Sequence, residues 1–292
     1  MLIFYFSLKG KFKCTYRTSL FVEIISLTLQ KGTVSDIWGR SMSFDLSGGL
    51  DGQNMSITLA LVLTLLLASR FKNILDTKGS IAAGALGLVV GVLGHWSWLV
   101  ILLAFLLSSH KATKLNWGEK SKYGFCESID GSRGWYNVAA NGSMPAIIAI
   151  YSFTQGNWGD MLWIFTASVA VATSDTWASE IGCLDKRVWM ITTMKKCEPG
   201  VNGGISINGQ FAAIAGSALI GIVALAAGWL PAGGDLTTGI TMAAIVSLIG
   251  WLGCQMDSLL GAVFENRGLM TKGSVNAASI AFGVIVAWFI FL

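Results

Sequence analysis

Three carboxylates lie where apolar segments of the chain end. Asp175 and Glu180 belong to residues 172–182 (ATSDTWASEIG), and Asp257 belongs to residues 254–262 (CQMDSLLGA). Placing a carboxylate at the centre of a membrane helix costs about 2.5–3.5 kcal/mol, so one kept near membrane depth is expected to face a cavity, a partner or an ion. Hydration at the interface is the alternative. Because Mg²⁺ commonly takes carboxylate ligands, we predict that Asp175 and Asp257 bind a metal, directly or through water.

Glu180 cannot share that role on a regular helix. Asp175 and Glu180 are five residues apart, which corresponds to about 140° around an ideal helix. Either the helix loosens before Ile181 or the two carboxylates have different roles. In both cases we predict that Glu180 is a second catalytic carboxylate.

A glycine-rich turn has the chemistry of a phosphate site. Residues 198–206 (EPGVNGGIS) combine glycine-permitted conformations with backbone amides just before a predicted helix, and such amides can bind an anion. We predict that Asn202, Gly203 and Gly204 cradle phosphate. A plain turn into the next helix explains the pattern about as well.

Three lysines and one asparagine complete the candidate set. Lysine is a usual point-charge partner of phosphate, and we predict this role for Lys78, Lys111 and Lys114. Contact with lipid headgroups is the alternative reading of these lysines. Asn141, with Arg133 shortly before it, flanks a predicted membrane segment, where it binds either a ligand or, by default, a neighbouring helix.

The sequence lacks the motifs of several common enzyme classes. It contains no GxxxxGK[ST], GxGxxG, HExxH or GxSxG pattern. Its two histidines, His95 and His110, are predicted on opposite faces of the membrane and cannot act as a pair. Carboxylates, lysines, asparagine and glycine on one face remain, which suits Mg²⁺ and the phosphates of a nucleotide.

The elements that must position these residues are membrane helices. The chain is 53% hydrophobic and only 12% charged, and a soluble chain carries roughly twice that charge. When the apolar segments are threaded through a membrane, fourteen of the twenty Lys and Arg residues fall in four loops on one side, which the positive-inside rule makes cytoplasmic. The net charge of +4 therefore reflects the basic loops that set the orientation of the chain in the membrane. Membrane lipid, and no nucleic acid, is the expected partner.

The expected fold is an all-α, polytopic transmembrane helix bundle of seven or eight segments, including one short hairpin. The predicted segments are 55–71, 80–93, 96–109, 137–153, 160–180, 208–229, 236–256 and 275–292. The second and third have about 14 residues each and would span only about 21 Å of a hydrocarbon core of about 30 Å. If the two segments formed a single crossing, basic loops would lie on both sides of the membrane. The positive-inside rule therefore favours a hairpin of two crossings.

Glycine and the N-terminal region need separate interpretation. Glycines such as Gly87 and Gly216 concentrate in three predicted helices, where they favour close helix packing, with a glycine-lined substrate groove as the alternative. Residues 1–54 form a basic extension that fits the membrane pattern poorly, and residues 55–292 form the transmembrane helical domain. We interpret the extension as sequence upstream of a true start at Met42 or Met55, with an interfacial element or a poorly ordered tail as the alternatives.

The chain resembles a family of integral membrane proteins that includes transmembrane protein 19 and the phytyl-phosphate kinases of plants and cyanobacteria. The resemblance covers about residues 55–292. The blocks that carry it are DTKG (76–79), AANG (139–142), SDTWASEIG (174–182), NGGIS (202–206) with Gly209, and DSLLGA (257–262). The blocks DTWASEIG and DSLLGA are together specific.

This resemblance implies a membrane kinase that phosphorylates an isoprenoid monophosphate, such as phytyl or geranylgeranyl phosphate, to the diphosphate. It implies CTP or another nucleoside triphosphate as donor, with Mg²⁺. The competing function is a proton- or cation-coupled membrane transporter, in which Asp175 and Asp257 would carry the coupling ion. Transporter sites usually lie near the bilayer midplane and between repeated halves. Carboxylates at inner helix ends and the lack of an internal repeat favour the enzyme.

Overall fold

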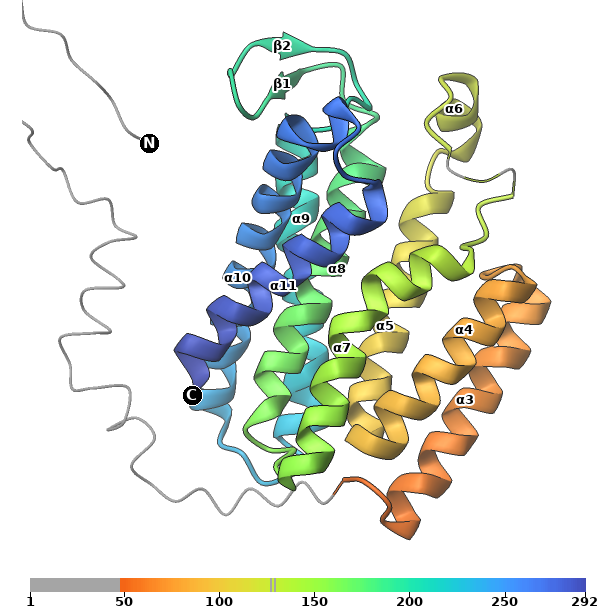
Figure 1. Cartoon of the computed structure of the whole chain (residues 1–292), viewed down its shortest axis with the longest axis vertical. Coiled ribbons are helices and arrows are strands. Elements are labelled where there is room, and N and C mark those ends of the chain that lie inside the picture. The colour runs from red at the N-terminus through yellow and green to blue at the C-terminus, as the bar shows by residue number, and fades with distance from the viewer. Residues whose placement is uncertain (1–47, 127, 129) are drawn as a thin grey trace, which may run out of the picture. The chain divides into compact units, whose positions relative to one another are not determined.

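The computed structural model describes residues 48–126, 128 and 130–292 of the 292-residue chain. Most of the basic extension lies outside the described residues, so its interpretation stays a prediction. The described chain forms eight long helices that run back and forth (Figure 1). They are α3 (Gly52–Lys72), α4 (Thr77–Leu88), α5 (Trp96–Lys114), α7 (Trp135–Gln155), α8 (Met161–Gly182), α9 (Ile207–Ala224), α10 (Leu236–Val263) and α11 (Lys272–Phe291).

Short elements extend or join these helices. A π-helical turn, Val89–Gly94, continues α4, and another, Leu225–Trp229, continues α9. The helix α6 (Trp117–Lys122) lies between α5 and α7, and a 3-10 turn, Glu265–Arg267, follows α10. The polytopic helical membrane fold predicted from the sequence is thus confirmed.

Six of the described helices are long and apolar enough to cross a membrane by length and composition. They are α3, α4 with its π-helical turn, α5, α9 with its π-helical turn, α10 with the 3-10 turn, and α11. The two other predicted segments, α7 and α8, fall outside this set. Helix α8 is long enough, but its Ser, Thr and Asp residues make it less apolar. It packs against α5, α7, α9, α10 and α11, and every residue from Met161 to Ser174 is buried. A helix surrounded by other helices can carry Ser and Thr because lipid does not cover it.

The hairpin predicted to be short is longer than expected. The first helix of the pair spans 18 residues, Thr77–Gly94, and the second spans 19, Trp96–Lys114. Polar residues extend both helices beyond the apolar runs: Asp76 accepts the Gly79 N–H at 2.6 Å and caps α4, and Lys111 and Lys114 lie in the last turn of α5. Eighteen residues rise about 27 Å, which is close to the thickness of the hydrocarbon core.

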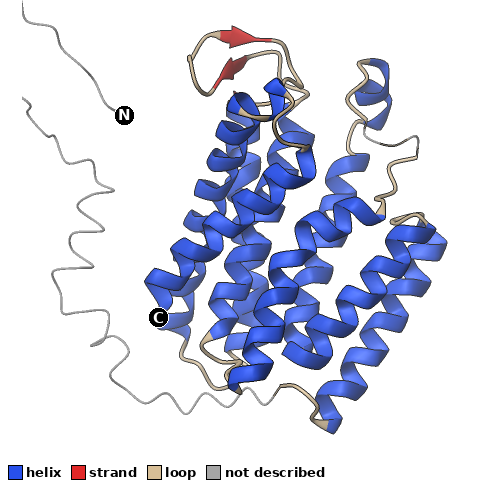
Figure 2. Ribbon diagram, in the orientation of Figure 1, coloured by secondary structure: helices blue, strands red, loops and turns tan. Residues whose placement is uncertain are grey.

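A small antiparallel sheet departs from the all-α expectation. Between α8 and α9 the strands β1 (Val188–Met190), β2 (Lys196–Cys197) and β3 (Gly204–Ser206) pair in the order β2-β1-β3. Figure 2 shows the strands β1 and β2 beyond the helix ends. Strands of two or three residues are too short for an alternating pattern to reveal them.

Close packing around α8 explains part of the glycine content. A Cβ atom on Gly253 of α10 would lie 2.4 Å from Val171 Cγ2, and one on Gly283 of α11 would lie 2.5 Å from the same atom. Both glycines therefore let their helices approach α8 more closely than alanine would allow. This supports the packing interpretation of the glycine-rich segments.

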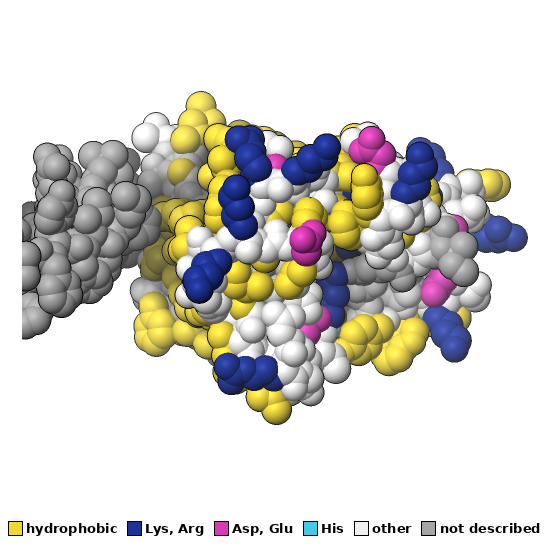
Figure 3. Space-filling model, turned by 90° about the horizontal axis from the view of Figure 1, so that it is seen from above, with side chains coloured by type: hydrophobic (Ala, Val, Ile, Leu, Met, Phe, Trp, Pro, Cys, Tyr) yellow, Lys and Arg dark blue, Asp and Glu magenta, His cyan; other side chains and the backbone are white. Residues whose placement is uncertain are grey.

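The four basic loops gather at one end of the bundle, which we call the polar end. It carries the connections α3–α4, α5–α7, α8–α9 and α10–α11 (Figure 1). Seen from this end, Lys and Arg side chains surround a face on which Asp and Glu also lie (Figure 3). At the opposite end Trp158 Nε1 donates to the Leu93 carbonyl at 2.9 Å, and Gly49 N donates to Gly94 O at 2.8 Å. The alternating path predicted from charge is therefore the observed one.

Candidate active site

Asp175 and Asp257, the two predicted metal ligands, face one another in the structure. Asp175 comes from α8 and Asp257 from α10, and their carboxyl groups are in hydrogen-bonding contact. From α11, the Ser279 hydroxyl donates to Asp257 Oδ2 at 3.0 Å. Three helices thus converge on this carboxylate pair, and each carboxylate lies in the last two turns of its helix.

The depth of the carboxylate pair follows from helix length. Helix α10 has 28 residues and rises about 42 Å, which exceeds the hydrocarbon core by about 12 Å. If α10 begins at one interface, the excess places Asp257 near the other. Both carboxylates are only partly buried, as expected for groups at the border between lipid and water.

The carboxylate pair fits a divalent cation. Two carboxylates in contact repel each other unless a proton or a cation lies with them. Among the described residues no three His, Cys, Asp or Glu side chains form a possible metal site. Two carboxylates with substrate oxygens and water suffice for Mg²⁺, which is usually bound in this way.

Arg133 lies beside these acidic groups. It precedes α7, and its guanidinium is close enough to Glu180 and Asp175 that their charges act on it. Burial lowers the pKa of Arg133, and the two carboxylates oppose that change. Its Cζ also lies 5.6 Å from the centre of the Phe105 ring. An arginine keeps its charge in proteins, so Arg133 brings a fixed positive charge next to Asp175.

Glu180 has partners of its own on the other side of α8. Lys120 Nζ lies 2.7 Å from Glu180 Oε2, and Thr113 Oγ1 donates to Glu180 Oε1 at 2.7 Å. Lys120 is 1% exposed and also donates to the carbonyls of Ala112 and Thr113. Asp175 and Glu180 thus have different hydrogen-bond partners, consistent with their separation of about 140° around the helix. In this arrangement Glu180 fastens the α5–α6 corner to α8.

We expect the substitution Lys120→Ala to destabilise the protein. The substitution removes the charged partner of Glu180 and the hydrogen bonds that Lys120 donates to two carbonyl groups and to the partly buried Glu180 carboxylate. We therefore expect the free energy of unfolding to fall by about 1–3 kcal/mol. Thermal unfolding in detergent measures it. The matched control is Lys122→Ala, which removes an exposed lysine from the same short helix. Equal melting temperatures for the two variants would contradict the fastening role of Lys120.

The predicted phosphate turn lies against α10, at residues that follow Asp257 closely in the sequence. Gly203 has φ +83°, and a Cβ atom there would lie 2.4 Å from Ala262 Cβ and 2.9 Å from the Ser258 carbonyl. Asn266 Nδ2 donates to the Asn202 carbonyl at 3.0 Å. The Gly204 N–H is used within the turn, where it donates to Val201 O at 2.9 Å. The structure thus brings this turn to the DSLLGA segment that carries Asp257.

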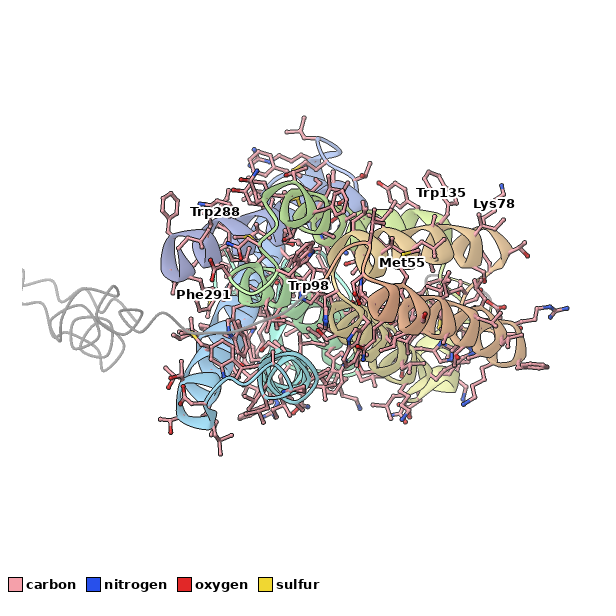
Figure 4. The ribbon with its side chains drawn as sticks, turned by 90° about the horizontal axis from the view of Figure 1, so that it is seen from below. Met55, Lys78, Trp98, Trp135, Trp288 and Phe291 are labelled. Atoms are coloured by element: carbon pink, nitrogen blue, oxygen red, sulfur yellow. The ribbon has the colours of Figure 1, made fainter. Side chains whose placement is uncertain are left out.

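The three predicted lysine partners of phosphate are at the polar end but apart from the carboxylate pair. Lys78 is exposed at the start of α4, and its side chain points outward from the edge of the bundle (Figure 4). Lys111 is also exposed. Lys114 donates to the Asp130 carbonyl and lies 4.9 Å from the centre of the Trp117 ring. None of the three has a described contact with Asp175 or Asp257.

Two pockets meet at Arg133 and Asn137. The apolar pocket has a volume of about 530 Å³ and lies among α3, α4, α5 and α7. The polar pocket, of about 340 Å³, lies on the α5–α6 side and is lined by Thr113, Lys120 and Glu180. Arg133 and Asn137 line both pockets. Arg133 therefore lies at the junction of the apolar and polar pockets and close to Asp175.

Asn141 faces the apolar pocket with an unused acceptor. The residue is 6% exposed, and its Nδ2 donates to the Asn137 carbonyl one turn earlier at 2.9 Å. Its Oδ1 is buried and accepts no hydrogen bond from any described residue. A neighbouring helix is therefore not the partner of this oxygen, which differs from the default expectation for Asn141.

Arg133 and Lys120 are the site residues that sequence reasoning missed. From the sequence alone, Arg133 is a polar group before a predicted membrane segment, and Lys120 is one of several basic residues in a loop. For Arg133 a signal did exist, because it precedes the AANG block that contains Asn141. Lys120 carries no such signal, since nothing in the sequence separates it from its exposed neighbour Lys122.

This fold and site define a polytopic helical membrane protein with a carboxylate pair near one end of its helices. The chain belongs to the family described as integral membrane protein DUF92, which matches residues 60–287. This confirms the family resemblance inferred from the sequence blocks. No solved structure matches the chain.

Three relatives illustrate the spread of the family. An uncharacterized membrane protein of Methanocaldococcus jannaschii is 29% identical over 237 residues, which cover 80% of this chain and 93% of that protein. Protein PGR of Arabidopsis thaliana is 28% identical over 231 residues, covering 73% of this chain and 80% of that protein. Protein VTE6, chloroplastic, of Arabidopsis thaliana is 26% identical over 221 residues, covering 73% of this chain and 64% of that protein.

Proposed function

We propose that this protein is a membrane phosphotransferase that converts an isoprenoid monophosphate, such as phytyl or geranylgeranyl phosphate, to the diphosphate. The donor would be CTP or another nucleoside triphosphate, with Mg²⁺. The observation that carries the proposal is the contact between Asp175 and Asp257 with Arg133 beside Asp175. Family membership supports it, because the blocks containing these carboxylates carry the resemblance to phytyl-phosphate kinases.

The site contains the charges that phosphoryl transfer needs. In the reaction an oxygen of the acceptor phosphate forms a bond to the γ-phosphorus of the donor. The bond from the γ-phosphorus to the bridging oxygen breaks, and the nucleoside diphosphate leaves with the electron pair. A phosphate monoester is largely dianionic at neutral pH, so no strong general base is required. Positioning and charge neutralisation dominate such reactions.

The described residues divide these tasks. Asp175 and Asp257 would hold Mg²⁺, which when bound neutralises phosphate oxygens of the donor. Arg133 would bind the acceptor phosphate through its fork of N–H donors. The turn at Asn202 and Gly203 would contribute backbone amides, and Lys78, Lys111 and Lys114 would attract the nucleotide to the polar end. We propose that this end faces the cytoplasm, where the nucleotide is available.

Incubation of the purified protein in detergent tests the reaction. The protein is mixed with geranylgeranyl or phytyl monophosphate, Mg²⁺ and CTP, ATP, GTP or UTP in turn, and the lipid products are separated. We expect the diphosphate to form with at least one nucleotide and not after Mg²⁺ is chelated. If no nucleotide gives diphosphate with either lipid, the proposed activity is wrong.

The competing transporter function follows from the same carboxylate pair. Two carboxylates in contact can share a proton or a cation and release it. A transporter would move the ion and a second solute across sealed vesicles without nucleotide. Uptake that needs an ion gradient and no nucleoside triphosphate would favour the transporter over the kinase.

A further inference from the structure

The apolar pocket has walls suited to a hydrocarbon chain. Leu65 of α3, Leu86 of α4, and Leu103 and Leu106 of α5 line it. On α7, a Cβ atom added at Gly142 would lie 2.3 Å from Leu86 Cδ2, so α4 and α7 touch at this wall. Gly87 of α4 and Gly142 of α7 are also part of the lining.

Among the described lining residues of this pocket, the polar side chains come from a single stretch of the chain. They are Arg133, Asn137 and Asn141, and all three lie in the first turns of α7 or just before it. The buried Asn141 Oδ1 lacks a described hydrogen-bond donor. A buried acceptor without a partner is unfavourable, and a water molecule bound between Asn141 and a phosphate headgroup would supply the missing donor.

We propose that the apolar pocket holds the hydrocarbon chain of a single isoprenoid monophosphate, with its phosphate at Arg133. This inference rests on the proposed function and deepens it by placing the acceptor. The phosphate would then lie at the junction with the polar pocket, next to Asp175. Arg133 is the only charged residue among the described residues that line the apolar pocket, so its charge complements an anionic headgroup.

Pocket size gives this proposal a quantitative form. The empty space of about 530 Å³ includes a part that is open to the surroundings, so the length of chain that fills it is a measurable property of the site. Each buried methylene group strengthens binding by about fourfold. Affinity should therefore rise steeply from dimethylallyl to geranyl to farnesyl monophosphate. It should level off at the length that fills the pocket.

Binding without nucleotide or metal tests the proposal. Radiolabelled geranylgeranyl monophosphate and its shorter homologues are titrated onto the purified full chain in detergent by scintillation proximity. Inorganic phosphate and geranylgeraniol serve as headgroup-only and tail-only competitors, and each should compete at least tenfold more weakly than the complete ligand. Competition by diacyl phosphatidic acid equal to that by geranylgeranyl monophosphate would identify a bilayer lipid as occupant and overturn the proposal.

Pocket-filling variants supply the structural test. Leu106→Trp should weaken binding of geranylgeranyl monophosphate at least tenfold and leave dimethylallyl monophosphate nearly unchanged. The matched control is Leu107→Trp, since Leu107 is the next residue of α5 and is 45% exposed, outside the pocket. If Leu106→Trp does not fold, Val138→Phe in the pocket lining is compared with Ala139→Phe at an exposed neighbour.

The outcomes separate this proposal from the proposed function. Equal affinities of a pocket variant and its control for the long-chain ligand would overturn the placement of the chain, even if the enzyme makes diphosphate. Selective loss in the pocket variant supports the placement, even if no nucleotide gives product. In that second case the reaction fails and the binding site stands.

Discussion

Replacing Asp175 by Asn is expected to lower the rate of diphosphate formation by at least about 100-fold. Asparagine has the size of aspartate but lacks the charge needed to hold a divalent cation beside Asp257. The folded state should not suffer, because an amide can donate to the Asp257 carboxylate where two carboxylates repel. The melting temperature of the variant in detergent should equal or exceed that of the natural sequence.

Two measurements distinguish a metal role of Asp175 from a structural one. Addition of Mg²⁺ with nucleotide should raise the melting temperature of the natural protein by mass action, and this increase should vanish in Asp175→Asn. Asp160→Asn is the control, because Asp160 precedes the same helix at the opposite end of the bundle. Full activity in Asp175→Asn would remove the metal role, and a large fall in melting temperature would indicate a structural one.

The path of the chain through the membrane was predictable because it depends on local properties. Long apolar runs and loops rich in Lys and Arg each reflect a free energy of insertion that the segment carries by itself. The pairing of Asp175 with Asp257 was also expected. A carboxylate kept near membrane depth should face a partner or an ion, and both residues were predicted to bind a metal. Helix ends were less accurate, because caps such as Asp76 extend a helix past its apolar run.

The parts of the site that were missed depend on tertiary contacts. Lys120 resembles any basic loop residue until folding buries it against Glu180. The apolar pocket forms where four helices fail to fill the space between them, and no periodicity in one segment reports that. Glu180 is an intermediate case: its angle from Asp175 indicated either a loosened helix or a separate role, and the fold shows the separate role through the contact with Lys120.

Replacing Arg133 by Gln is expected to raise KM for the isoprenoid monophosphate and to lower kcat/KM for it by about 100-fold or more. The guanidinium is the fixed positive charge at the junction of the two pockets, and a neutral amide cannot offset the charge of a phosphate dianion. Arg133→Lys should lose less, about tenfold, since it keeps the charge but not the fork of parallel donors. Steady-state kinetics with each substrate varied in turn measures both effects.

The kinetic pattern of the Arg133 variants decides which phosphate this residue binds. If Arg133 binds the acceptor, KM for the nucleotide should stay within about twofold of its natural value, because the donor would be held by the carboxylate-bound metal and the basic loops. Arg70→Gln, which removes an exposed arginine from the last turn of α3, controls for loss of basic charge at the same end. A higher KM for nucleotide with an unchanged KM for lipid would move Arg133 to the donor side, and the acceptor phosphate would then need another partner near Asp175.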